Sequence, residues 1–255
     1  FPLALIILYL AFFKIEQLFL LIIFCTPLSF NLEALDMVGG FGIYLPTEPL
    51  LLGLLLVFIF KTIRSEKNRL NTYWRHPISF LILIQLVWIT LSAISSEMPI
   101  VSFKFLLSRL WFVVPIFFLG LHVFKKGIPT IYAFLWAYLT PLTLVLLYTL
   151  IIHASYGFSE ESGHWVMWPF FKDHTSYGAI IALFYPIVIG LMTDKENSFF
   201  TKNILRIIFI IFSVALFYSY TRAAWISVFG ASLVFLLFVF KIKFKYLFSF
   251  GLTAL

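Results

Sequence analysis

Long apolar stretches separated by short polar segments run through the whole chain. A helix needs about 20 apolar residues to cross the hydrocarbon core of a bilayer, and most of these stretches approach that length. Apolar residues lie on all sides of most of them, as in helices that contact lipid and other helices at once. The predicted spans are residues 1–13, 17–32, 43–60, 77–96, 101–124, 128–152, 175–193, 203–220, 223–240 and 246–255. The pattern predicts an all-α fold, a polytopic transmembrane helical bundle with about eight complete spans and two cut at the ends.

We interpret residues 1–255 as a single integral membrane domain. The chain begins at Phe1 and ends at Leu255, each inside an apolar stretch, so we expect it to be a fragment of a longer protein. The longer polar segments are predicted to be outer loops at 31–46 and 153–174 and a basic inner loop at 61–76. The turn near 219–221 contains neither glycine nor proline, and one long helix over 203–240 is the alternative to a hairpin.

Charge is divided between alternate loops and orients the predicted bundle. One set of segments holds fourteen Lys and Arg residues against four acids, a net charge of +10, and the other set holds four against seven, a net charge of −3. Short loops rich in Lys and Arg stay in the cytoplasm, so the acidic set is predicted to face outward. The basic residues of this outer set are Lys104, Arg109, Lys172 and Arg222.

Composition excludes several classes of protein. With 62% apolar and 11% charged residues and a mean hydropathy of +1.05, the chain is not a soluble globule. The basic pI comes from the inner loops, so no nucleic-acid partner is expected. The single Cys25 excludes an intrachain disulfide, and no metal-ligand spacing is present. Acidic residues are absent from the middle of the predicted spans, which argues against a proton- or sodium-coupled transporter.

Cationic side chains follow predicted helix starts on the outer side. Helix N-termini carry free N–H groups and a positive dipole end, which together with guanidinium groups suit phosphate. Ser102, Asp173 or Thr175, and Thr221 are the predicted caps. Arg222 would be the first residue of the last predicted helix whose N-terminus lies on the outer side. The alternative is that Arg222 pairs with a lipid phosphate.

Arg109 follows Lys104 by five residues, which places it roughly 7 Å deeper along a helix. An ionised group at that depth usually faces a cavity or a partner, so both residues are candidates for anion binding. The alternatives are that Arg109 extends to the interface or pairs with Glu97.

Aromatic and polar side chains gather in the 153–174 loop. His174 is a candidate to donate to a substrate oxygen, although capping a helix or binding water is the alternative. Trp165 and Trp168 suit stacking on sugar rings or anchoring at the membrane interface. Lys172 precedes the same helix start, and the histidines at 153 and 164 are weaker candidates.

Two short motifs resemble a known family. Residues 170–178 read Phe-Phe-Lys-Asp-His-Thr-Ser-Tyr-Gly and precede an apolar span with Pro186; residues 219–225 read Ser-Tyr-Thr-Arg-Ala-Ala-Trp. These segments resemble the two signatures of the O-antigen ligase and O-antigen polymerase family. Segments 27–49 and 102–111 resemble the version found in Bacteroidetes.

The resemblance implies a metal-independent glycosyltransferase of the bacterial inner (cytoplasmic) membrane, with no cofactor. It would transfer a glycan from an undecaprenyl-diphosphate carrier to a sugar hydroxyl of the lipid A core or of the growing O-antigen at the periplasmic face. The family's diphosphate-binding arginines correspond to Arg222 and Arg109, which would act in catalysis, with Lys104 binding substrate beside them. Apart from the resemblance, we expect Lys172, His174, Trp165 and Trp168 to bind substrate at the outer helix start.

The family's large periplasmic loop, with a histidine proposed to activate the acceptor, normally lies beyond these helices. We therefore expect this chain to hold the donor half of the site alone. Membrane lipids are expected partners in every case. The alternatives are a flippase or exporter of lipid-linked oligosaccharide, or a non-catalytic lipid-binding membrane protein.

Overall fold

The computed structural model describes residues 2–32, 43–64 and 76–239, and in these ranges the chain is almost entirely helical. It divides into two compact units, Phe1–Pro141 and Leu142–Leu255. The centre of the predicted 31–46 loop, most of the 61–76 loop and the predicted span 246–255 lie outside the described residues. The all-α class is confirmed.

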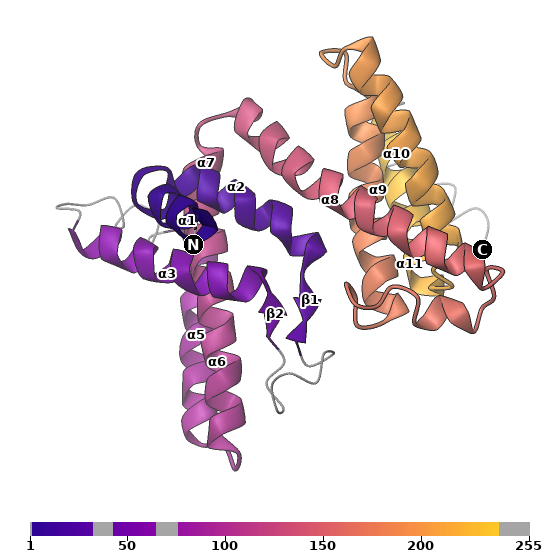
Figure 1. The fold of residues 1–255 in the computed structure, drawn as a ribbon. Helices are drawn as coiled ribbons and strands as arrows, with labels where there is room; N and C mark the ends of the chain where they lie inside the picture. Colours follow the sequence, from indigo (N-terminus) through magenta and orange to yellow (C-terminus); the bar gives the residue numbers. More distant parts are fainter. Residues whose placement is uncertain (1, 33–42, 65–75, 240–255) are drawn as a thin grey trace, which may run out of the picture. The chain divides into compact units, whose positions relative to one another are not determined.

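The first unit contains the elements α1 (Pro2–Phe13), α2 (Ile15–Cys25), β1 (Phe30–Asn31), β2 (Tyr44–Leu45), α3 (Thr47–Arg64), α5 (Pro77–Ile94), α6 (Pro99–Val114) and α7 (Gly120–Phe124). A π-helical turn, Pro115–Leu119, joins α6 to α7 in one continuous helix. Helices α5 and α6 pack side by side as a hairpin (Figure 1). The core lies between α2, α3 and the end of the α6–α7 helix, and includes Phe19, Ile22, Leu54 and Val123.

The long helix α8 (Ile128–Ser155) begins in the first unit and ends in the second. The second unit continues with α9 (His174–Thr193), α10 (Phe199–Phe217) and α11 (Arg222–Val239). Helix α9 packs against both α10 and α11 (Figure 1). Residues of both helices are buried where they pack, including Ile181 and Val188 of α9 and Leu205 and Phe212 of α10. The predicted break between 203–220 and 223–240 is confirmed.

Local sequence explains where these helices begin. The Asp173 carboxylate accepts the Ser176 N–H at the start of α9, and the Ser198 hydroxyl accepts the Thr201 N–H at the start of α10. Helices α5 and α6 begin with proline, whose missing N–H costs nothing in the first turn. The prediction that Ser102 caps a helix is wrong, because α6 already begins at Pro99.

Six helices in the described part of the chain are long and apolar enough to cross a membrane: Pro77–Ile94, Pro99–Phe124, Ile128–Ser155, His174–Thr193, Phe199–Phe217 and Arg222–Val239. The protein is therefore a multi-pass membrane protein in contact with lipid.

The two other predicted complete spans differ from the prediction. The apolar helix at Ile15–Leu28 is shorter than a crossing needs, and a strand follows it at Phe30. Helix α3 begins at Thr47 and carries Glu48, Lys61 and Arg64. The hairpin of β1 and β2 takes up residues that the prediction had given to these spans and to the 31–46 loop.

Charge contacts within the first unit follow the predicted division of the loops. Lys126 Nζ lies 2.6 Å from Glu16 Oε2, and both residues belong to the segments predicted to be cytoplasmic. Lys104 and Glu48, both of the predicted outer set, attract each other electrostatically. Segments that the charge count assigns to one side therefore meet in the fold.

Candidate functional site

The turn between α10 and α11, residues 218–221, organises one end of the second unit. We call these four residues the corner. Tyr220 adopts a left-handed backbone conformation with φ 50°, which turns the chain without a glycine. Ser219 and Thr221 are buried, and the Thr221 hydroxyl donates to the carbonyl oxygen of His174 at 2.9 Å. The first residue of α9 is thus tied directly to the residue before α11.

The segment between α8 and α9 packs onto this corner. Helix α8 extends to Ser155, so the segment is residues 156–173, shorter than the predicted 153–174 loop. The Tyr220 hydroxyl donates to the Phe158 carbonyl at 2.7 Å, and Gly163 lies so close to the Tyr220 ring that a Cβ there would come within 2.6 Å of it. Buried His153 contacts the Ser159 carbonyl through Nε2 at 3.0 Å. This histidine therefore supports the loop from within the core.

The two neighbouring helix starts differ in what they offer an anion. At α9 the Asp173 carboxylate already accepts from the Ser176 N–H and from the Thr175 hydroxyl. These hydrogen bonds, Thr175's first, lower the pKa of Asp173 to about 2. The predicted cap at Asp173 is confirmed, and its negative charge occupies the position an anion would take.

At α11 none of the carboxylates that the structure describes occupies the helix start. The Thr221 hydroxyl donates to carbonyl groups, and its own carbonyl accepts from the N–H groups of Ala224 and Trp225. Among the described residues the N–H groups of Arg222 and Ala223 have no partner, and the Arg222 side chain is exposed with no hydrogen bond or ion pair. The start of α11 therefore combines free N–H groups with a guanidinium group, the arrangement that binds phosphates.

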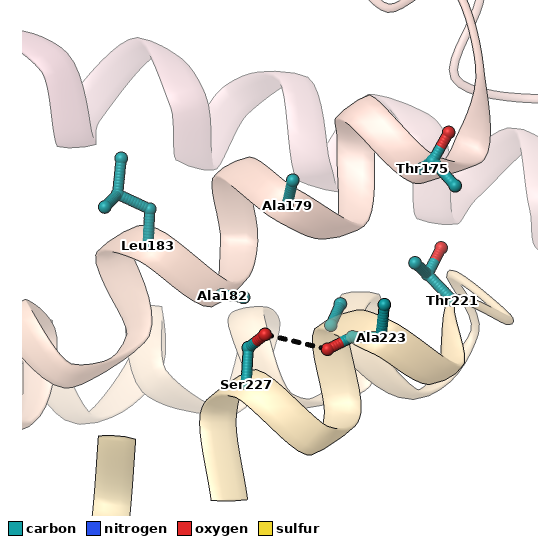
Figure 2. A pocket seen from close by; sticks show the side chains of 8 residues that line it. Thr175, Ala179, Ala182, Leu183, Thr221, Ala223 and Ser227 are labelled. Atoms are coloured by element: carbon teal, nitrogen blue, oxygen red, sulfur yellow. Dashed lines mark hydrogen bonds between the residues drawn. The ribbon is translucent and has the colours of Figure 1, made fainter. Parts of the chain in front are cut away.

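A cavity of about 500 Å³ lies between α9 and α11 (Figure 2). Small or apolar residues form its walls: Ala179, Ala182 and Leu183 from α9, and Ala223, Ala224 and Ser227 from α11. Thr175 and Thr221 lie together at one end of it, as Figure 2 shows. Arg222 stands in the chain between two of the lining residues. The cavity has an apolar wall and a cationic helix start at its threonine end.

His174 lies beside another histidine of the same segment. Its Nδ1 atom is 3.1 Å from Nδ1 of His164, and the two rings meet edge to face at 82°. The sequence indicates His174 as a candidate and His164 as a weaker one. Nothing in their ten-residue spacing indicates a contact. The fold of the 156–173 segment onto the corner brings them together.

The remaining predicted residues of this loop lie on its surface. Trp165 and Trp168 are about half exposed, at 48% and 50%, and the Trp165 ring packs on Tyr156 at 4.8 Å between centroids. Lys172 is exposed immediately before Asp173. These side chains offer aromatic and cationic groups next to the start of α9.

Lys104 and Arg109 belong to helix α6 of the first unit, whereas Arg222 belongs to the second. Arg109 is exposed, and its guanidinium carbon lies 5.1 Å from the centre of the Phe105 ring one turn earlier. Such a stack on an aromatic face holds the cation in place. Convergence of Arg109 with Arg222 stays a prediction.

In the described ranges no group of three or more His, Cys, Asp and Glu side chains is arranged to hold a metal ion. Comparison with known proteins does not assign the chain to a family: no family model, curated protein or solved structure matches it. The residues of the site itself are therefore the basis for a function.

Proposed function

We propose that the start of α11 binds the diphosphate of an undecaprenyl-diphosphate-linked glycan at the periplasmic face of a bacterial inner membrane. The glycan would then pass to a sugar hydroxyl, as in the O-antigen ligase and polymerase family. The observation that carries the proposal is the free helix start at Arg222 beside an apolar cavity. Asp173 excludes the equivalent role for α9.

The two parts of the site match the two parts of such a donor. The cavity volume lies within the roughly 300–1,000 Å³ of small-molecule sites, and its alanine and leucine walls suit a hydrocarbon chain. The N–H groups of Arg222 and Ala223 and the Arg222 guanidinium suit the phosphate oxygens. A polyprenyl diphosphate has an apolar chain that ends in an anion, just as the apolar cavity ends at the cationic start of α11.

Transfer would break the bond between the sugar's anomeric carbon and the diphosphate oxygen and form one to the acceptor hydroxyl oxygen. The diphosphate leaves with the bonding electrons, so fixed cations and oriented N–H groups lower the barrier by stabilising its growing charge. A base must take the hydroxyl proton. Trp165, Trp168, Lys172 and His174 of the same unit would bind the glycan beside this point.

The first test is binding of undecaprenyl diphosphate to the protein in lipid nanodiscs. We expect Arg222→Ala to weaken binding by roughly 10- to 100-fold, since charged hydrogen bonds are each worth about 1.5–3 kcal/mol. Arg222→Lys should also weaken it, because an ammonium group lacks the bidentate fork. The matched control is Arg206→Ala, which removes an exposed arginine from α10 of the same unit.

The second test is glycan transfer in membranes that contain the intact protein. Arg222→Ala should abolish transfer at unchanged protein level, while His174→Ala should reduce it less. Equal binding and transfer by the Arg222 and Arg206 variants would refute the diphosphate site. Strong Arg222-dependent binding without transfer in the intact protein would refute the enzymatic role and favour a carrier-binding protein or flippase.

A further inference from the structure

The contact between His164 and His174 has a geometry that fits two ligands of one metal ion as well as a hydrogen bond. The two Nδ1 atoms lie 3.1 Å apart, with the ring planes at 82° and the ring centres 4.3 Å apart. Imidazole nitrogens bind zinc at about 2.0–2.1 Å, so two of them at 90–109° around one ion are separated by about 2.9–3.4 Å. The observed separation falls within this range.

We infer that His164 and His174 are two adjacent ligands of one divalent transition-metal ion of the class that prefers imidazole: zinc, nickel or copper. This inference does not rest on the proposed function, although both use His174. His164 is exposed and His174 partly exposed, so an ion can reach both Nδ1 atoms from solvent. Neutral imidazole nitrogen is a common ligand for these ions, whereas magnesium and calcium prefer oxygen.

The corner holds both histidines in place before any ion binds. Gly163, the neighbour of His164, is packed against the Tyr220 ring, and the His174 carbonyl accepts from the Thr221 hydroxyl. Buried Ser162 adds hydrogen bonds to Ser159 on the other side of the turn. Two adjacent residues of one turn, Tyr220 and Thr221, therefore position both ligands, and little conformational entropy is lost on binding.

Two imidazole ligands leave the rest of the coordination sphere open. The nearest carboxylate in sequence, Asp173, is committed to the cap of α9, and no group of three ligands exists in the described parts of the chain. Water would complete the sphere, so the ion would exchange readily, in contrast to a closed structural zinc site. Its effect would be to fasten the 162–164 turn to the first turn of α9.

Copper binding measures this directly, because the electron paramagnetic resonance spectrum of Cu²⁺ reports how many imidazole nitrogens ligate it. We expect the protein in lipid nanodiscs to bind one Cu²⁺ with two equivalent nitrogens, and ZnCl₂ to compete for it. His164→Ala and His174→Ala should each leave one ligating nitrogen and weaken Cu²⁺ binding at least tenfold. Loss of a residue that merely hydrogen-bonds to a metal ligand already weakens metal affinity by about that factor. The control is His122→Ala, which removes an exposed histidine of the first unit.

His164→Asn separates metal binding from folding. An asparagine side chain keeps a polar contact to His174 and should fold like the native chain by its melting temperature, yet it should lose the two-nitrogen spectrum. Native-like Cu²⁺ binding by this variant would overturn the site. Two other results would mean that the two histidines form a hydrogen bond only. One is a Cu²⁺ spectrum that no substitution of His164 or His174 changes. The other is loss of all Cu²⁺ binding in the control His122→Ala.

Discussion

Asp173 precedes α9 and Arg222 begins the neighbouring helix α11. Their opposite charges give the two helix starts different chemistry. Asp173 supplies its own anion to α9 and satisfies the Ser176 N–H. Arg222 adds a cation to a start that already carries free N–H groups. The N–H groups at the helix start are therefore occupied by a carboxylate in α9 and left available to an anion in α11.

Acid should weaken the α9 cap through Asp173. Its pKa in the folded protein is about 2, below the ordinary value of about 3.9, so its contribution to stability is complete above about pH 4 and disappears as pH falls toward 2. Asp173→Asn keeps an oxygen acceptor without a titrating group, so its melting temperature should fall less than the native one between these pH values. Asp173→Ala should lose about 1 kcal/mol at neutral pH. Identical pH profiles for the native chain and Asp173→Asn would contradict this role.

Small residues line the sides of α9 and α11 that face each other. Ala179, Ala182, Ala223 and Ala224 line the cavity between the helices, and Gly178 lies against Thr221 of the corner. Small residues allow such close packing in membrane proteins, where lipid is as apolar as leucine and large side chains gain little by leaving it. At Gly178 the contact is tight, because a Cβ there would lie 2.8 Å from Thr221 Cβ.

Gly178→Ala should destabilise the protein and move the corner. The added methyl group would clash with Thr221 and strain its hydrogen bond to His174, and overpacking of this kind costs roughly 1–3 kcal/mol. The matched control is Gly190→Ala on the same helix, where nothing lies within 4 Å of the added Cβ. That variant should be neutral or more stable by up to about 1 kcal/mol, because alanine is the better helix former.

The melting temperatures of Gly178→Ala and Gly190→Ala in nanodiscs compare their stabilities. Cu²⁺ binding by the same two variants reports whether the corner still positions the two histidines. If Gly178→Ala is as stable as Gly190→Ala and keeps Cu²⁺ binding, the tight contact between α9 and the corner is wrong.

Across the whole molecule, the division of charge makes a prediction about orientation. In the second unit the starts of α9 and α11 are tied to each other by Thr221 and His174, and the basic 194–206 segment lies beyond the other end of α9. The positive-inside rule then places the corner and the 156–173 segment outside and the 194–198 turn inside.

Cysteine labelling of intact cells tests this orientation. Glu160→Cys and Glu196→Cys are the same substitution at two exposed positions, one in each turn, made in a chain whose native Cys25 is replaced by alanine. A membrane-impermeant maleimide should label position 160 and label position 196 only after the membrane is permeabilised. The reverse pattern would invert the topology and remove the periplasmic assignment of the site.

Sequence alone determined the membrane class, the helical fold and most helix positions. A run of about 20 apolar residues has few alternatives in lipid, because every backbone N–H and C=O must be satisfied within the segment. Where the prediction differed, at α2 and at Thr47, a short hairpin and charged residues interrupt the apolar runs. The cap at Asp173 was also predictable, because a carboxylate at a helix start acts locally.

Tertiary structure decided which polar residues meet. The contact of His164 with His174, the tie from Thr221 to His174 and the cavity beside Arg222 all join segments separated in sequence. Hydrophobic periodicity does not encode such contacts, because lipid-facing and buried sides of these helices are equally apolar. They arise from close packing at Gly163 and Gly178 and from the left-handed turn at Tyr220, which become visible only when the helices are packed.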